Sequence, residues 1–291
     1  MLRSPGKIIR CLIDDFTTTL FPANCKSCAG PLEHASIIPV CETCIQNVVR
    51  TDLFACERCG DAINLDLDLE DMRFAGLLAE GFQCRECKLA SPSFESAVAF
   101  ATYTGTMRLL IHLLKFSRIR RVAHLLGGRL AEAVLKIEGR AAQNLLVIAV
   151  PLFRTRERQR GFNQSVLLAN EALRWLKRLR PEWRLTAGHG ALVRIRRTEG
   201  QWVLSPKGRR RNLKGAFQVR ANVSGREILL IDDVLTSGAT ARECAHVLLR
   251  AGAAKVWVAT LARAQKQFVQ QQHEDAKQYV AAWDLPTGSK V

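Results

Sequence analysis

The chain has 291 residues, of which 48% are hydrophobic and 24% are charged, proportions that are ordinary for a globular protein with a sizeable core. No apolar run approaches the roughly 20 residues that span a bilayer, and Asp14 and Asp15 interrupt the apolar stretch near the N-terminus. We therefore expect a cytoplasmic protein with no secretory signal and no integral membrane association.

The net charge of +16 is concentrated in the middle of the chain. Residues 1–100 contain 9 Lys/Arg and 14 Asp/Glu, residues 101–226 contain 27 and 6, and residues 227–291 contain 7 of each. Such a basic segment attracts polyanions, which include nucleic acid, an anionic membrane surface and phosphorylated small molecules. The alternative is a solvated basic face that provides only solubility.

Three segments are expected from the pattern along the chain. Residues 1–94 would form a cysteine-rich metal-binding domain, with a short leader helix over 1–22. Residues 95–263 would form an α/β domain, because helical and strand-like periods alternate there. Residues 264–291 would be a polar tail, since they begin with a Gln-rich stretch.

Eight cysteines form four Cys-x-x-Cys pairs: Cys25/Cys28, Cys41/Cys44, Cys56/Cys59 and Cys84/Cys87. Without a secretory signal, this density favours zinc over disulfides, because the cytosol keeps thiols reduced. One Cys-x-x-Cys turn supplies two thiolates, so two turns complete a tetrahedral structural site. The sequence therefore predicts two structural Zn²⁺ ions, with a set of redox-active thiols as the alternative.

Two pairing schemes are compatible with these spacings, sequential and alternating. The sequential scheme is favoured because 12 residues separate the first two pairs, a spacing typical of zinc ribbons, and 24 residues between the last two accommodate an acidic insert. His34 could replace a thiolate, but eight cysteines already suffice. Cys11 and Cys244 are expected to be small buried residues and not nucleophiles.

The α/β segment begins with apolar residues at the helical interval in 106–116 and again over 125–130. Strands are expected at 145–150, 226–232 and 255–261, helices at 164–179 and 239–252, and a basic, turn-rich stretch up to about residue 225. Strands that alternate with helices predict an α/β fold with a parallel sheet covered on both faces.

The strand at 226–232 leads directly into two carboxylates, Asp232 and Asp233, and then into a loop of small residues. The loop consists of Thr236, Ser237, Gly238, Ala239 and Thr240. Ligands of open α/β sheets bind beyond the carboxyl ends of the strands, where a helix start offers unpaired N–H groups to a phosphate. Carboxylates repel phosphate but accept hydrogen bonds from neutral hydroxyls. The string therefore predicts a site for a phosphorylated sugar.

Two other interpretations of this string have to be considered. One is a plain strand-to-helix turn in which an aspartate caps the helix. The other is a nucleotide-hydrolysing P-loop, which the sequence excludes because the Gly-Lys-Ser/Thr signature is missing.

The string ILLIDDVLTSGAT resembles the phosphoribosyl-pyrophosphate (PRPP) binding motif of type I phosphoribosyltransferases. More narrowly, the chain resembles the ComF/GntX family, which is associated with competence and the use of external DNA. LLKF at 113–116, VPLFRTRERQRGFNQ at 150–164 and RRTEGQWVLSPKGRRRNLKGAF at 196–217 carry the same resemblance. Ala149 and Phe153 depart from the family pattern, which often has proline and histidine there.

The resemblance implies a type I phosphoribosyltransferase-like parallel-sheet domain behind a double zinc ribbon. It implies that Asp232 and Asp233 hold the ribose hydroxyls and that the 236–240 loop cradles the 5′-phosphate. Lys115, Arg154 and Arg160 would contact pyrophosphate, with Mg²⁺ neutralising the leaving oxygens. Lys115 and Arg160 would serve catalysis together with the two aspartates.

Three further residues, Gln201, Arg211 and Asn212, match the family pattern without a role that follows from their chemistry. A structural role is an equal alternative for each of them.

Two hypotheses of function follow. In the first, the protein handles single-stranded DNA in the cytoplasm, the basic segment tracks the strand, and a PRPP-type pocket persists in the fold. Trp175, Trp183 and Trp202 would then stack on bases or, alternatively, pack in the core. In the second, the protein is an active phosphoribosyltransferase on an unidentified acceptor. A further option makes the cysteine-rich domain a docking module for DNA-uptake machinery or a helicase.

Overall fold

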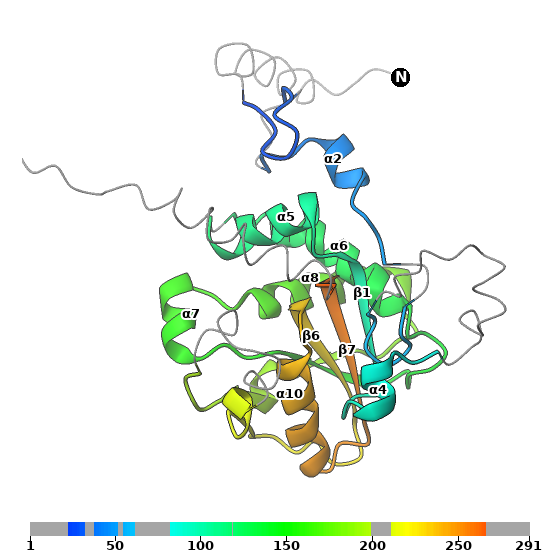
Figure 1. The fold of residues 1–291 in the computed structure, drawn as a ribbon. Helices are drawn as coiled ribbons and strands as arrows, with labels where there is room; N and C mark the ends of the chain where they lie inside the picture. The colour runs from blue at the N-terminus through cyan, green and yellow to red at the C-terminus, as the bar shows by residue number, and fades with distance from the viewer. Residues whose placement is uncertain are drawn as a thin grey trace, which may run out of the picture.

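A five-stranded parallel sheet forms the centre of the structure (Figure 1), a computed structural model that describes residues 23–32, 38–51, 55–61, 82–117, 119–198 and 211–265. The strand order is β1-β7-β6-β2-β3. The bounds are β1 Ser96–Thr102, β2 Leu145–Ala149, β3 Thr186–Ala187, β6 Glu227–Leu235 and β7 Lys255–Arg263. A separate antiparallel pair is formed by β4 (Leu192–Arg194) and β5 (Phe217–Val219).

Helices cover both faces of the sheet. The helices are α2 Glu42–Gln46, α4 Arg85–Leu89, α5 Gly105–Lys115, α6 Val122–Leu135, α7 Arg154–Arg160, α8 Gln164–Leu179 and α10 Ala239–Arg250, with a 3₁₀ turn at His189–Ala191. The core on one face contains buried residues of α5, α6 and α8, and the core on the other contains those of α10, β4 and β5. The predicted α/β fold with a parallel sheet covered on both faces is therefore confirmed.

The buried strands explain this two-sided core. In β6, Leu229 and Ile231 face the core of α5, α6 and α8, whereas Ile228 and Leu230 face the core of α10. A strand alternates its side chains between faces, so a strand buried on both sides is a continuous apolar run. The run in β6 ends where Asp232 begins.

The chain changes direction between β2 and β6. From β2 it continues to β3 on one side of the sheet, and from β6 it continues to β7 on the other. The helices after these strands lie on opposite faces, α8 on one and α10 on the other. The carboxyl ends of β2 and β6 thus flank a topological switch point, where ligands of open α/β sheets bind.

Three of the strands were predicted and the others were not. The apolar runs at 145–150, 226–232 and 255–261 correspond to β2, β6 and β7. The turn-rich stretch before residue 225 contains β3, β4 and β5, which have only 2 or 3 residues each and leave little periodicity to read. Strand β1 is an additional edge strand of 7 residues, all buried.

The leader over 1–22 and most of the tail over 264–291 lie outside the described residues, and the division at residues 94 and 95 stays a prediction. Within the part of the chain that the structure describes, no helix is long and apolar enough to cross a membrane.

Candidate functional site

The eight paired cysteines gather into two clusters. Cys25, Cys28, Cys41 and Cys44 form the first cysteine cluster, and Cys56, Cys59, Cys84 and Cys87 form the second. In each cluster the four sulfur atoms lie within 4.8 Å of one another. This grouping agrees with the sequential pairing and not with the alternating one.

The donor sets of both clusters fit zinc. Zn–S bonds of about 2.3 Å place the sulfurs of a tetrahedral site about 3.8 Å apart. The Sγ atoms of Cys28 and Cys41 are 3.8 Å apart, and those of Cys59 and Cys84 are 3.7 Å apart. Closed sites with four thiolates leave no position for a substrate, so these clusters are suited to structural ions.

In each cluster a backbone N–H donates to one sulfur, and the pKa of that thiol is lowered. The N–H of Cys41 lies 3.3 Å from Cys25 Sγ, and that of Cys84 lies 3.2 Å from Cys56 Sγ. Although burial opposes ionisation of Cys25, such N–H donors lower its pKa to about 6. A hydrogen bond from Cys59, against the cost of burial, lowers the pKa of Cys56 to about 4. Deprotonated sulfurs are the form that binds metal.

The remaining sequence candidates for ligands or thiol chemistry are separate from the clusters. Cys244 lies on α10 with no exposed surface, and burial raises the pKa of its thiol, which agrees with a packing role. His34 and Cys11 lie outside the described residues.

The predicted phosphate loop follows β6 as expected. Gly238 has φ 71° and ψ 5°, a left-handed conformation that glycine adopts without strain, and α10 begins at Ala239. Thr236 is exposed at the start of the loop, and Ser237 Oγ lies 3.4 Å from the N–H of Ala239. The 236–240 loop therefore opens a 12-residue helix at the carboxyl end of β6, the position at which an anion meets unpaired N–H groups.

The two aspartates have different partners. Asp233 Oδ2 lies 2.6 Å from Lys115 Nζ, and both side chains are largely buried, with exposures of 6% and 17%. Burial alone lowers the pKa of Lys115, but the carboxylate of Asp233 outweighs it and raises the pKa. The structure thus brings together two predicted site residues that are 118 positions apart, and it pairs them with each other.

Asp232 is held by a hydroxyl and a backbone amide. Its Oδ1 accepts hydrogen bonds from Ser165 Oγ at 3.0 Å and from the N–H of Asp233 at 2.9 Å. Burial, followed by repulsion from the Asp233 carboxylate, raises the pKa of Asp232 to about 7. Asp232 thus titrates near neutral pH.

The start of α8 positions this pair of carboxylates. Asn163 Oδ1 caps α8 by accepting from the N–H of Ser165 at 2.9 Å, and Asn163 Nδ2 donates to the carbonyl of Val150 at 3.1 Å. The RGFNQ stretch therefore ties the end of β2 to α8 and presents Ser165 to Asp232. Sequence analysis missed Ser165, although its position beside a family motif was a usable signal.

Arg154 and Arg160, both predicted to contact pyrophosphate, lie at opposite ends of α7. The Arg160 guanidinium bonds to Gln164 and stacks 5.5 Å from the centre of the Phe116 ring. Burial lowers the pKa of Arg160, while the charge of Asp233 opposes that shift. Arg154 is exposed and lines a shallow cavity together with Glu157, Arg158 and Gly161. Only Arg160 is thus close to the paired Lys115 and Asp233.

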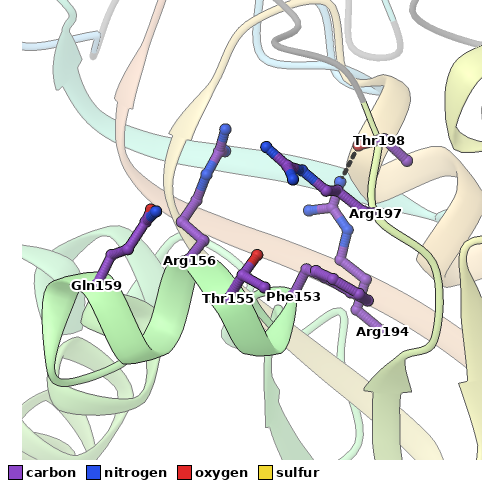
Figure 2. Close-up of a pocket in the computed structure, with 7 residues that line it drawn as sticks. All are labelled: Phe153, Thr155, Arg156, Gln159, Arg194, Arg197 and Thr198. Atoms are coloured by element: carbon purple, nitrogen blue, oxygen red, sulfur yellow. Dashed lines mark hydrogen bonds between the residues drawn. The ribbon is translucent and has the colours of Figure 1, made fainter.

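A second cavity, of about 430 Å³, separates α7 from the strand end of β4. Its described lining consists of Phe153, Thr155, Arg156, Gln159, Arg194, Arg197 and Thr198 and contains no acidic side chain. Figure 2 shows that the side chains of Arg156, Arg194 and Arg197 extend toward a common space. Burial and the nearby charge of Arg156 lower the pKa of Arg194. This crowding of cations favours an anionic ligand.

Three tryptophans were predicted either to stack on bases or to pack in the core. The two that lie among the described residues pack against other side chains. Trp183 is 7% exposed, and Trp175 packs beside Gly128 and against the core that contains α5, α6 and α8. Trp202 and Gln201 lie outside the described residues. Among the described residues of this region, Phe116 is an exposed aromatic residue, at 65%, and directly follows Lys115. Its ring contacts the Arg160 guanidinium and lies 5.0 Å from the centre of the His112 ring, so only part of its surface is available for base stacking.

The departure at Ala149 has a structural partner. The N–H of Ala149 donates to His189 Nδ1 at 3.2 Å, and His189 Nε2 lies 3.0 Å from Asn170 Oδ1. A proline at position 149 would lack this N–H. Burial lowers the pKa of His189, which agrees with a neutral ring whose Nδ1 accepts and whose Nε2 donates.

The fold and the site define a parallel α/β domain that carries two zinc-type cysteine clusters. No family model matches the chain. It is 37% identical over 247 residues to the DNA utilization protein YhgH of Escherichia coli O157:H7, covering 83% of this chain and 97% of that protein. It is 32% identical over 187 residues to competence protein F of Haemophilus influenzae, covering 62% of this chain and 78% of that one. The chain therefore belongs to the family of these proteins, as the resemblance to ComF/GntX predicted.

Solved structures give a weaker likeness. The chain is similar over half its length to a hypoxanthine-guanine phosphoribosyltransferase from Bacillus anthracis, with 14% identity, 67% of that chain covered and a TM-score of 0.29. It is also similar to a hypoxanthine phosphoribosyltransferase from Trypanosoma cruzi, with 12% identity, 76% of that chain covered and a TM-score of 0.32. Both TM-scores are low, and the parallel-sheet fold is established by the strand order and pairing of this chain.

Two zinc ions per chain are expected, one in each cluster. Cys84→Ser should reduce the bound zinc from two ions to one, because three thiolates no longer close the second site. Cys244→Ser is the matched control and should retain both ions, since Cys244 lies apart from the clusters. Elemental analysis of the purified proteins measures both; a control that also loses an ion would contradict the assignment.

The pKa of Asp232 predicts a pH-dependent stability. Its folded-state value of about 7 is above the ordinary value of 3.8, so its contribution is fully present below 3.8 and is lost as the pH rises through 7. Asp232→Asn does not titrate, and its free energy of unfolding should therefore rise relative to the wild type by about 2 kcal/mol from pH 5 to pH 8. Urea denaturation at both pH values measures this, with Glu182→Gln as a surface control. Parallel pH profiles of Asp232→Asn and wild type would refute it.

Proposed function

We propose that this protein acts in DNA utilization in the cytoplasm, where it handles single-stranded DNA and binds a phosphoribosyl ligand such as PRPP. One observation carries the proposal. Two carboxylates and an N–H-rich loop opened by a left-handed glycine lie at the carboxyl end of β6, beside the topological switch point. The relatives named for DNA utilization and competence support the cellular role.

Different parts of the site would bind the charged and the uncharged groups of the ligand. The 236–240 loop and the start of α10 would receive the 5′-phosphate, since free N–H groups and the helix dipole favour an anion there. Asp232 and Asp233 would accept hydrogen bonds from the ribose hydroxyls. Each carboxylate has about four lone-pair sites, so Asp233 can accept a hydroxyl while it keeps its bond to Lys115.

The ion pair changes the role expected of Lys115. A lysine whose charge is balanced by Asp233 at 2.6 Å adds little net attraction for pyrophosphate. Lys115 therefore orients Asp233 and lowers its repulsion toward the anion. Arg160, beside this pair, would contact pyrophosphate, and Mg²⁺ would supply further charge neutralisation when it accompanies the ligand.

The cavity between α7 and β4, the arginine cavity, supports binding of the DNA backbone. Arg156, Arg194 and Arg197 present three guanidinium groups to one space, and its described lining has no carboxylate to balance them. Phosphate contacts of this kind are independent of sequence and dominate affinity for single strands. Phe116, exposed next to Lys115, would add a stacking surface.

A second function, transfer of the phosphoribosyl group to an unidentified acceptor, is favoured by the same cavity. At about 430 Å³ it lies within the size range of small-molecule sites and adjoins α7, which carries Arg160. The two functions differ in product: a transferase releases pyrophosphate from PRPP in the presence of its acceptor, and a binding protein does not.

The ribose assignment predicts a selective loss. At pH 8, where Asp232 is mostly ionised, Asp232→Asn should weaken PRPP binding by roughly 10- to 100-fold, because a charge-assisted hydrogen bond to a sugar hydroxyl becomes a neutral one. Binding of pyrophosphate, which has no ribose, should stay at the wild-type level. Calorimetric titration with both ligands in the presence of Mg²⁺ measures the difference. Equal losses for the two ligands would show that Asp232 does not contact the sugar.

The arginine cavity predicts the salt dependence of DNA binding. The double variant Arg156→Glu, Arg197→Glu should bind a fluorescent oligothymidine more weakly and flatten the slope of log affinity against log salt by about 1.4, since two phosphate contacts are lost. The double variant Arg178→Glu, Arg250→Glu changes the net charge equally on exposed helix positions and should keep the wild-type slope. If both double variants behave alike, only the net charge matters and the cavity is not the DNA site.

A further inference from the structure

The second cysteine cluster reaches the 236–240 loop through a buried ion pair. Asp61 lies two residues after Cys59, and its Oδ1 is 3.4 Å from Nη2 of Arg263 at the end of β7. The two side chains are 9% and 4% exposed. Buried charges require partners of this kind, so the pair holds the cysteine-bearing turn against the edge of the sheet from which the loop emerges.

Arg263 also binds the backbone of the loop itself. Its Nη1 donates to the carbonyl oxygens of Leu235, at 2.9 Å, and Thr236. The C=O and N–H of a trans peptide point in opposite directions. Anchoring these two carbonyls toward Arg263 therefore turns the N–H groups of Thr236 and Ser237 away from it. The direction of the donors at the start of the loop depends on this arginine.

A second contact joins the same cluster to the helix after the loop. Arg242, in the first turn of α10, donates from Nη1 to the carbonyl of Ala90 at 3.0 Å. Ala90 directly follows α4, which carries Cys87. The 84–90 half of the second cluster thus contacts α10 directly, and the 56–61 half reaches the 236–240 loop through Arg263.

The turn that carries Asp61 has little freedom of its own. The N–H of Cys56 donates to the carbonyl of Asp61 at 2.9 Å, and Gly60 is left-handed with φ 63°. A Cβ at position 60 would lie 2.6 Å from the carbonyl oxygen of Ala97 in β1, so only glycine fits there. The position of Asp61 is therefore set by the cysteine pair on one side and by β1 on the other.

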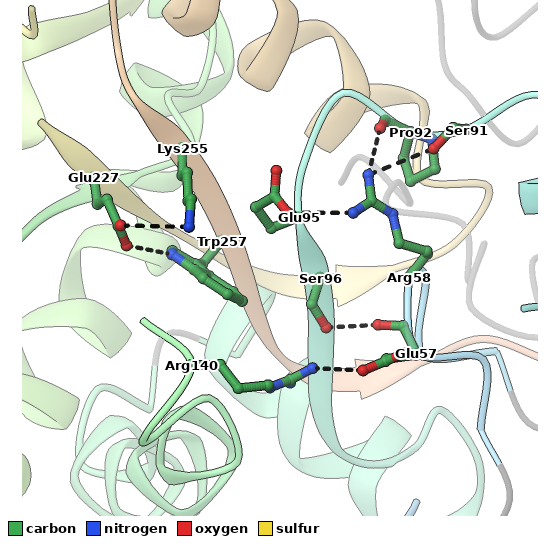
Figure 3. Close-up of polar contacts among 10 residues, drawn as sticks. All are labelled: Glu57, Arg58, Ser91, Pro92, Glu95, Ser96, Arg140, Glu227, Lys255 and Trp257. Carbon is green, nitrogen blue, oxygen red and sulfur yellow. Dashed lines mark hydrogen bonds and ion pairs between the residues drawn. The ribbon is translucent and has the colours of Figure 1, made fainter. Parts of the chain in front are cut away.

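Other contacts hold the same turn without touching the loop (Figure 3). Ser96 Oγ donates to the carbonyl of Glu57 at 2.7 Å, and Arg140 lies 3.3 Å from the Glu57 carboxylate. Arg58 lies 3.4 Å from Glu95. These exposed or half-buried contacts provide matched controls, because they dock the cluster but do not reach Thr236.

We propose that Arg263 is a positioning residue for the anion site, and that the second cysteine cluster, by holding Asp61 and Ala90, is an integral part of that site. Filling the second cluster with metal would then favour the loop conformation that receives a phosphate group, and a bound phosphate would in turn favour the filled cluster. This inference rests on the proposed phosphate role of the 236–240 loop. The first cysteine cluster has no such contact with the loop among the described residues, since its polar contact with the α/β domain runs from Ser27 to Thr106 on α5.

Amide hydrogen exchange tests the coupling without any ligand. The N–H groups of Arg242 and Ala264 bond to the carbonyls of Gly238 and Leu235 and report on the two ends of the loop. In Cys84→Ser both should exchange at least about tenfold faster than in the wild type, because the second cluster no longer holds Asp61 and Ala90 in place. In Cys28→Ser, which removes a ligand of the first cluster, they should exchange at the wild-type rate. Equal rates in the two variants would overturn the proposal.

Ligand binding tests the positioning role. Arg263→Met should weaken PRPP and inorganic phosphate alike, by about tenfold or more, whereas Arg140→Gln should leave both affinities unchanged. If Arg263→Met does not fold, Arg242→Met removes the other contact and should weaken both ligands in the same direction. Wild-type affinities in a folded Arg263→Met or in Arg242→Met would overturn the inference. Failure of the wild type to bind either ligand would instead refute the proposed function, while the exchange experiment would still decide whether the cluster holds the loop.

Discussion

The central position of β6 is the constraint on which the site depends. Up to Ile231 the strand is paired with β2 on one side and β7 on the other, and beyond Ile231 its described pairing continues with β7 alone. A strand fixed on both sides has no freedom to slip, because a shift of one residue would exchange its two buried faces. From Asp232 onward the side of β6 that faced β2 is no longer paired. The two carboxylates therefore lie on a rigid strand, at the position where its pairing with β2 has ended.

Charge balance separates two regions around this edge. The carboxylates have partners within the protein, Lys115 for Asp233 and Ser165 with a backbone amide for Asp232. The arginines of the cavity between α7 and β4 face one another instead, with no acid in the described lining. In the proposed function, internal pairing would reduce the repulsion of an incoming anion by the carboxylates, and the arginines of the cavity would attract it. Of the positive charge in the middle of the chain, the part that lines this cavity is the part on which the proposed binding function depends.

The sequence predicted the features that depend on local pattern and missed those that depend on tertiary contact. The long apolar runs located β2, β6 and β7, and Cys-x-x-Cys spacing gave the composition of both clusters, because two thiolates per turn is a local property. The ion pair of Lys115 with Asp233 joins residues 118 positions apart, and no periodicity encodes such a contact. Arg263 was missed for the same reason: at the end of an apolar strand it looks like a solvated terminus, yet it is 3% exposed.

The two cysteine clusters differ in what surrounds them, and this difference supports the proposed coupling of the second cluster to the loop. Cys25 of the first cluster belongs, together with Leu32 and Val40, to the core that contains α5, α6 and α8, so apolar packing supports that cluster. The buried apolar residues around the second cluster are its own cysteines, within the part of the chain that the structure describes. A unit with so little apolar surface would depend on bound metal to fold and on polar contacts to dock. Its docking contacts therefore depend on whether the cluster is folded. One of them leads through Arg263 to the backbone of the proposed anion site, and another joins Ala90 to Arg242 in the helix that follows.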